Sequence, residues 1–225
     1  MEFNHKKAIH FDLDGTLIDS VPDLALAVNE MLIILKKETF SEDAIRYWVG
    51  NGAQTLVKRA LLGKREIEDQ NIDETLFKEA HTVFLKAYTK HLCEATRSYP
   101  HVIETLQVLK AKGYRLSIIT NKPVQFVKPI LEGLGFDTLF EDFLGGDSLE
   151  KKKPDPLPLL HMCKTMGVTI DESVMVGDSK NDILAANTCG MQSIGVTYGY
   201  NYGEDIGVHK PSIIIDDFSK ILEYL

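Results

Sequence analysis

The segment FDLDGTLIDS, from Phe11 to Ser20, is the part of this chain that says most about its fold. Its first residue ends the short run Ala8-Ile9-His10-Phe11, which is rich in residues that favour a β-strand. Asp12 and Gly15 then interrupt the apolar pattern, as such residues do where a strand opens into a loop. The stretch therefore predicts a buried strand over residues 8–11, with acidic residues in the loop at its carboxyl end.

The remaining sequence divides into a helical part and an alternating part. From about residue 21 to 97 the apolar spacing is helical, including a short helix with Ser41 as N-cap and a long helix over 73–91. After Tyr99-Pro100, continuous apolar runs alternate with helical patterns. Strands are expected at 114–120, 143–144, 174–176, 192–196 and 212–215, and helices at 102–112, 123–131, 156–166 and 181–188.

Alternating strands and helices of this kind indicate a parallel sheet that helices cover on both faces. The helical part interrupts the alternation directly after the first strand. We therefore predict an α/β fold with a three-layer Rossmann-like parallel-sheet core and an inserted α-helical cap domain. The core domain would comprise residues 1–19 and 98–225, and the cap domain residues 20–97.

Composition narrows the class of partner and the compartment. The 225 residues carry a net charge of −8, which disfavours nucleic acid as a partner. Cys93, Cys163 and Cys189 form no CxxC pair, and this favours a reducing, cytoplasmic environment. No apolar run approaches the ~20 residues that a membrane span requires, and the first residues lack a signal-peptide core. The oligomeric state, monomer or homodimer, stays open.

Polar residues follow the carboxyl ends of the predicted strands, where open α/β sheets bind their ligands. These residues are Asp12, Asp14, Thr120, Asn121, Lys153, Asp178 and Asp182. Carboxylates brought together at this edge would repel one another, and a hard divalent cation such as Mg²⁺ would relieve that repulsion. Magnesium also favours phosphate oxygens, so the sequence predicts a site for a phosphorylated small molecule.

The same residues suit phosphoryl transfer. A carboxylate such as Asp12 can attack phosphorus and form an aspartyl-phosphate. Asp14, two residues further on, could protonate the leaving alcohol and later deprotonate water. Thr120, Asn121 and Lys153 could hold the phosphoryl oxygens.

With its three companion motifs, FDLDGTLIDS resembles the DxDGT signature of the haloacid dehalogenase superfamily of phosphatases. The companions follow in order and cover the whole chain: Thr120-Asn121 at a strand end, Lys153 in KKKPDP, and the run GDSKND from 177 to 182. The resemblance implies that Asp12 is the nucleophile and Asp14 the general acid and base. It also implies that Thr120 and Lys153 bind the phosphoryl group. Mg²⁺ would be held by Asp12, the backbone carbonyl of Asp14, and Asp178, with Asp182 as a ligand or a supporting residue.

The cap segment resembles the phosphoglycolate phosphatases, which split 2-phosphoglycolate into glycolate and phosphate. The resemblance lies in RYWVGNG from 46 to 52, LVKRAL from 56 to 61 and DSVPDL from 19 to 24. Arg46 is the candidate to contact the substrate carboxylate, because a guanidinium binds carboxylates bidentately. The alternative for Arg46 is a salt bridge on the cap surface. His101 departs from the group, which usually has Gly after Tyr-Pro.

Several alternatives remain open at this point. The substrate could instead be pyrophosphate, a nucleotide or a sugar phosphate, and the chain could be a phosphomutase or a binding protein that has lost catalysis. Lys122 is expected on the surface, and two of the three lysines in the run 151–153 are expected in a solvated loop.

Overall fold

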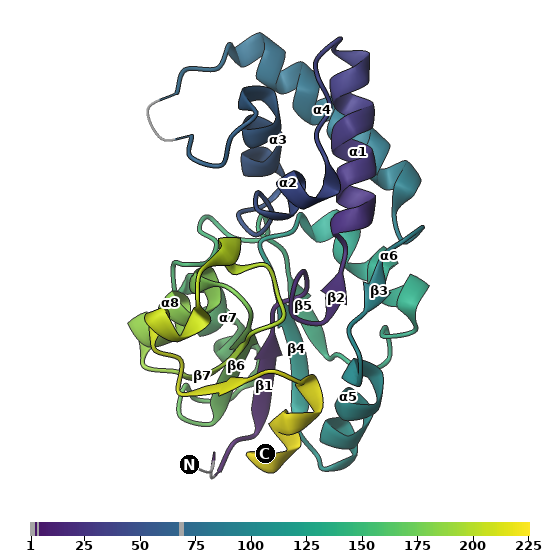
Figure 1. Cartoon of the computed structure of the whole chain (residues 1–225). Helices are drawn as coiled ribbons and strands as arrows, with labels where there is room; N and C mark the ends of the chain where they lie inside the picture. Colours follow the sequence, from purple (N-terminus) through teal and green to yellow (C-terminus); the bar gives the residue numbers. More distant parts are fainter. Residues whose placement is uncertain (1–2, 4, 68–69) are drawn as a thin grey trace.

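The computed structural model describes residue 3, residues 5–67 and residues 70–225. Its centre is a six-stranded sheet in the order β5-β4-β1-β6-β7-β8, with every neighbouring pair parallel (Figure 1). The strands are β1 (Ala8–Phe11), β4 (Arg115–Ile119), β5 (Asp142–Leu144), β6 (Ser173–Gly177), β7 (Gln192–Val196) and β8 (Ile213–Ile215). Each predicted strand is present, with ends within two residues of the prediction.

Strand periodicity divides the core between the two faces of the sheet. Ile9 and Phe11 of β1 belong to one apolar cluster, whereas Ala8 belongs to the other. Val174 and Met175 of β6 separate in the same way. Successive strand side chains point to opposite faces, so both faces of these central strands are buried.

Helices cover both faces, which confirms the three-layer Rossmann-like core. The cluster on one face includes residues of α7 (Leu157–Met166) and α8 (Lys180–Cys189). Residues of α5 (Val102–Ala111), α6 (Val124–Leu134) and the 3₁₀ helix η3 (Phe218–Glu223) belong to the other cluster. Two short 3₁₀ helices, η1 (Asn201–Gly203) and η2 (Ile206–His209), lie between β7 and β8. Helix α6 runs three residues beyond its predicted end and stops at Gly135, whose φ of 73° is left-handed.

The inserted helices lie above the carboxyl end of the sheet (Figure 1). They are α1 (Val21–Ile34), α2 (Glu42–Arg46), α3 (Ala53–Leu62) and α4 (Glu74–His91). Ser41 caps α2 by accepting a hydrogen bond from Ala44 N, as predicted, and Asp73 caps α4 in the same way. None of the helices in the described ranges is both long and apolar enough to cross a bilayer.

Two very short strands join the insertion to the core. β2 (Ile18–Asp19) pairs antiparallel with β3 (Arg97–Ser98), so the outgoing and returning chains lie side by side. The predicted boundaries between core and cap, at 19/20 and 97/98, fall at this two-stranded sheet. The cap here means residues 20–97.

His101, the N-cap residue directly before α5, has a left-handed φ of 63°. Glycine adopts this conformation without steric cost, which gives a physical reason for the glycine usual at this position in the phosphoglycolate phosphatases. In this chain the His101 ring lies 3.0 Å from a carboxylate oxygen of Asp217.

Candidate active site

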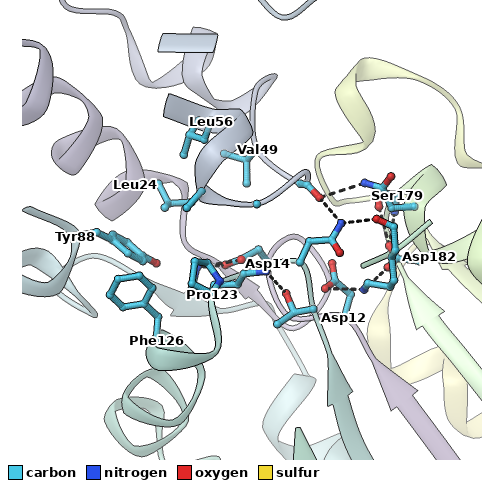
Figure 2. A pocket seen from close by; sticks show the side chains of 18 of the residues that line it. Asp12, Asp14, Leu24, Val49, Leu56, Tyr88, Pro123, Phe126, Ser179 and Asp182 are labelled. Atoms are coloured by element: carbon cyan, nitrogen blue, oxygen red, sulfur yellow. Dashed lines mark hydrogen bonds and ion pairs between the residues drawn. The ribbon is translucent and has the colours of Figure 1, made fainter. Parts of the chain in front are cut away.

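Loops from four strands meet in one pocket at the carboxyl edge of the sheet (Figure 2). Asp12 directly follows β1, Thr120 follows β4 and Asp178 follows β6, while Lys153 arrives on the longer loop after β5. The parallel arrangement places all these strand ends at the same edge. Six of the predicted site residues in the core domain line this pocket: Asp12, Asp14, Thr120, Asn121, Lys153 and Asp182.

Three buried carboxylates form a cluster within this site. One oxygen from each of Asp12, Asp178 and Asp182 lies within 4.8 Å of the others. Burial raises the pKa of Asp12 to about 7, although Lys153 lowers it. Burial, followed by the charge of Asp12, raises the pKa of Asp178 to about 8. The cluster therefore resists full ionisation unless further positive charge is supplied.

These carboxylates fit a hard divalent cation. Asp12 Oδ1 is buried, and within the described ranges its one close polar contact is the ion pair with Lys153, so it can also serve as a ligand oxygen. Carboxylate and carbonyl oxygens are the donors that Mg²⁺ prefers. The side chain of Asp14 points elsewhere and is not part of the carboxylate cluster. The group of Asp14 that is predicted to bind Mg²⁺ is the backbone carbonyl, and the orientation of the side chain is compatible with that role.

Lys153 supplies the buried positive charge beside the cluster. Its Nζ lies 3.0 Å from Asp12 Oδ1 and 2.6 Å from Asp182 Oδ1, and it also contacts the Ile119 carbonyl oxygen. Burial lowers the pKa of Lys153, but Asp12 and Asp182 overcome this effect and leave the pKa raised. The ammonium therefore stays charged next to the predicted nucleophile.

Asp182 has a structural role that the sequence motif does not reveal. It is the third residue of α8 and accepts hydrogen bonds from Ser179 N at 3.0 Å and Ser179 Oγ at 2.8 Å. With the Lys153 ammonium on Oδ1, three donors bind this carboxylate, and one of them carries the charge that offsets it. This arrangement favours Asp182 as a residue that positions Lys153 over Asp182 as a direct metal ligand.

Asp178 is fixed by hydrogen bonds and by glycines that leave room for it. Thr16 Oγ1 donates to Asp178 Oδ1 at 2.8 Å, and Tyr200 N donates to Oδ2 at 2.8 Å. A Cβ at Gly15 would lie 2.3 Å from Asp178 Oδ2, and one at Gly199 would lie 2.1 Å from Asp178 Cβ. Gly15 also has a φ of 91°, which side-chain-bearing residues rarely adopt.

Asp14 lies on the other side of Asp12 and contacts Lys122. Lys122 Nζ donates to Asp14 Oδ1 at 2.7 Å and Oδ2 at 3.0 Å, and Ser20 Oγ also donates to Asp14 Oδ1. The expectation that Lys122 is a surface residue was wrong, because it is only 4% exposed. Its position just after Thr120-Asn121, at a strand end, was the signal that could have identified it.

Asn121 connects the core loops to the cap. Its Nδ2 donates to Lys153 O at 2.9 Å and to Gly50 O, in the cap, at 3.1 Å. Thr120 Oγ1 accepts from Lys122 N at 3.2 Å and faces the same pocket. Asn121 therefore positions the loops, while its buried Oδ1 has no partner among the described residues.

The cap is held closed on the core by a second group of contacts. Asn51 Oδ1 accepts from Tyr202 OH at 2.8 Å, and Asn51 O accepts from Lys152 Nζ at 2.6 Å. Arg65 donates to Tyr202 O at 3.0 Å. Lys152 is thus half-buried and bonded to the cap, so the expectation of two solvated lysines in the run 151–153 was wrong; only Lys151 is exposed.

Arg46 does not reach this pocket. Its guanidinium donates to Asp19 at 3.0 Å and Glu42 at 2.9 Å, and it lies over the Tyr200 ring at 5.5 Å. It is absent from the described residues that line the pocket. Of its two predicted roles, the contacts correspond to the salt bridge.

The chain is similar to known proteins over nearly its whole length. A family model for haloacid dehalogenase-like hydrolases matches residues 9–196. The phosphoglycolate phosphatase of Colwellia psychrerythraea strain 34H is 53% identical over 222 residues, covering 99% of this chain and 98% of that protein. The phosphoglycolate phosphatase of Psychrobacter arcticus is 49% identical over 220 residues, covering 98% and 96%.

A solved structure extends the similarity to the fold. The crystal structure of a predicted phosphoglycolate phosphatase from Haemophilus somnus 129pt matches with a TM-score of 0.91 and 44% sequence identity. The match covers 98% of each chain, and so includes both the sheet and the inserted helices.

Proposed function

The chain belongs to the haloacid dehalogenase-like hydrolases and is a phosphatase, and from that premise we propose that it hydrolyses 2-phosphoglycolate to glycolate and phosphate with Mg²⁺ as cofactor. The observation that carries the proposal is that Asp12 meets Lys153 in one pocket and shares a buried carboxylate cluster with Asp178. Relatives named phosphoglycolate phosphatase, at 53% and 49% identity, support the choice of substrate.

In the first step, a carboxylate oxygen of Asp12 attacks phosphorus and forms the aspartyl-phosphate. The bond from phosphorus to the glycolate oxygen breaks, the electron pair stays on that oxygen, and Asp14 gives it a proton. Lys153 and Thr120 hold the phosphoryl oxygens during transfer. The products of this step are glycolate and a phosphorylated Asp12.

In the second step, water attacks the phosphorus of the aspartyl-phosphate and transfers a proton to Asp14. The bond from phosphorus to Asp12 breaks, which regenerates the Asp12 carboxylate and releases phosphate. Mg²⁺, held by Asp12, the Asp14 carbonyl and Asp178, would neutralise charge on the phosphoryl oxygens. The closed cap would limit access of bulk water.

The direct test pairs a nucleophile variant with a substrate panel. Asp12→Asn should lower phosphate release from 2-phosphoglycolate by about 1,000-fold or more, because an amide oxygen is a poor nucleophile. Robust turnover by this variant would refute the nucleophile assignment.

The panel ranks kcat/KM for 2-phosphoglycolate against pyrophosphate, nucleoside monophosphates and sugar phosphates. We expect 2-phosphoglycolate to rank first, and a low rank would refute the substrate. Isomer formation from a hexose 1-phosphate without free phosphate would indicate a phosphomutase instead.

We also propose a cytoplasmic location. Cys93, Cys163 and Cys189 are free thiols in the folded chain. Unpaired thiols of this kind are typical of reducing compartments.

A further inference from the structure

An apolar chamber adjoins the acidic end of the pocket. Figure 2 shows Tyr88, Phe126, Leu24, Val49 and Leu56 on one side of Asp14, with Asp12, Ser179 and Asp182 on the other. Most of these apolar residues come from the cap, while Phe126 belongs to α6 of the core. Side chains of this kind exclude water, and a charge pair formed among them is stronger than one in solvent.

Two polar groups stand at the boundary between the chamber and the acids. Lys122 Nζ lies within 3.0 Å of both Asp14 carboxylate oxygens and 4.8 Å from the centre of the Tyr88 ring. Burial lowers the pKa of Lys122, but Asp14 and then Tyr88 overcome this effect and leave it raised. Lys122 lines the pocket, and its ion pair with Asp14 holds the ammonium group at the pocket wall.

Tyr88 provides a second, independent observation. Its side chain is 1% exposed, and its hydroxyl lies beside Lys122 but has no hydrogen-bond acceptor within the part of the chain that the structure describes. Figure 2 shows that hydroxyl directed toward the side of the pocket where Asp14 lies. A buried hydroxyl whose hydrogen has no acceptor is costly, so the position is suited to a ligand that accepts its hydrogen bond.

The cations near the site can be compared directly. Among the described residues that line the pocket, the cationic side chains are Lys122 and Lys153. Lys153 is bound by Asp12 and Asp182, on the side where phosphoryl transfer takes place. Arg46 is bound by Asp19 and Glu42 outside the pocket. Lys122 is paired with Asp14, the predicted acid for the leaving oxygen, and is therefore the pocket cation on the side of the leaving group.

We propose that Lys122 and Tyr88 form the subsite that binds the substrate carboxylate, an assignment that rests on the proposed function. In 2-phosphoglycolate the carboxylate is separated from the leaving oxygen by a single CH₂ group. A group that donates to Asp14, the predicted acid for that oxygen, is within reach of such a short chain. The Lys122 ammonium and the Tyr88 hydroxyl would then supply two donors, while the apolar walls contact the CH₂ group.

This subsite defines a class of substrate. It favours phosphate esters of short 2-hydroxy acids over esters with an uncharged leaving group. An uncharged group would gain little from the Lys122 charge, and one without a hydrogen-bond acceptor would also leave the Tyr88 hydroxyl unpaired. Sites with unmatched buried polar groups discriminate strongly.

The test compares two esters that differ in one group. 2-Phosphoglycolate is set against 2-hydroxyethyl phosphate, in which a CH₂OH group replaces the carboxylate, and the ratio of the two kcat/KM values is the readout. Lys122→Met should lower this ratio by about 100-fold, and Tyr88→Phe by about 10-fold. A substitution that acted only by disturbing Asp14 would slow hydrolysis of both esters equally and leave the ratio of the two kcat/KM values unchanged.

Matched variants separate the explanations. Lys128→Met removes an exposed cation of α6 and should keep the wild-type ratio. Arg46→Met should also keep it, and a drop in the ratio there but not in Lys122→Met would overturn the assignment. Circular dichroism checks folding; if Lys122→Met does not fold, Tyr88→Phe, which removes one oxygen atom, tests the same subsite.

The proposed function and the subsite fail in different ways. A wild-type ratio near one refutes 2-phosphoglycolate as the preferred substrate, and the subsite with it. A high wild-type ratio that survives in both Lys122→Met and Tyr88→Phe refutes the subsite alone.

Discussion

At the residue scale, the two acids of FDLDGTLIDS have different surroundings despite being two positions apart. Asp12 lies beside Lys153 and the carboxylate cluster, whereas Asp14 is held by Lys122 and Ser20. The surroundings of Asp12 suit a nucleophile that binds a cation together with other carboxylates. The surroundings of Asp14 suit a group that exchanges protons with the leaving oxygen. These different neighbours support the division of roles proposed for the two acids.

Asp14→Asn tests that division. For 2-phosphoglycolate, kcat should fall by about 100- to 10,000-fold, because an alkoxide leaves poorly without a proton. With p-nitrophenyl phosphate the leaving phenolate needs no proton, so a rapid burst of nitrophenolate should persist in stopped-flow measurements. Equal losses on the two esters, with no burst, would contradict the assignment of Asp14 as the acid.

At the element scale, the loop between α2 and α3 is one part of the cap that touches the core. Gly50 O accepts hydrogen bonds from Asn121 and Asn181, each at 3.1 Å, and Asn51 bonds to Tyr202. Tyr202 itself has a left-handed φ of 55° within η1. The contact is thus formed by short polar segments, which can separate and re-form more readily than packed helices.

Tyr202→Phe should weaken the closed arrangement. It removes the hydroxyl that donates to Asn51 Oδ1 at 2.8 Å and accepts from Asn181 Nδ2 at 3.2 Å. Loss of these bonds should lower kcat/KM for 2-phosphoglycolate by about three- to tenfold. Tyr224→Phe, near the C-terminus at the opposite end of the core (Figure 1), is the matched control. Unchanged steady-state kinetics in Tyr202→Phe would show that this contact does not stabilise the active form.

At the scale of the whole molecule, a divalent cation should stabilise the fold itself. Mg²⁺ at about 100 times its Kd should raise Tm by on the order of 5 °C, because it binds carboxylates that repel one another only in the folded chain. Asp178→Asn should abolish this shift and raise Tm in the absence of metal. Asp137→Asn, an exposed position, should behave like wild type. A Mg²⁺ shift that survives in Asp178→Asn would place the cation elsewhere.

The sequence predicted the architecture and most of the site because both depend on local patterns. Apolar runs marked the strands, and polar residues directly after them marked Asp12, Thr120 and Asp178. The pairing of Lys122 with Tyr88 could not be predicted in this way, because Tyr88 belongs to α4 and the contact exists only once the cap closes on the core. The strands β2 and β3 were also missed, since two residues are too few to show a period.

The pairing of β2 with β3 has a mechanical consequence. Ile18 pairs with Ser98 and Asp19 with Arg97, so the only two covalent links between the helical insertion and the sheet are fastened to each other. Two tethers joined along one short line permit rotation about that line and resist sliding or twisting. The cap would then open by rotation about this one axis. Glycolate would leave through the same gap by which the phosphate ester enters.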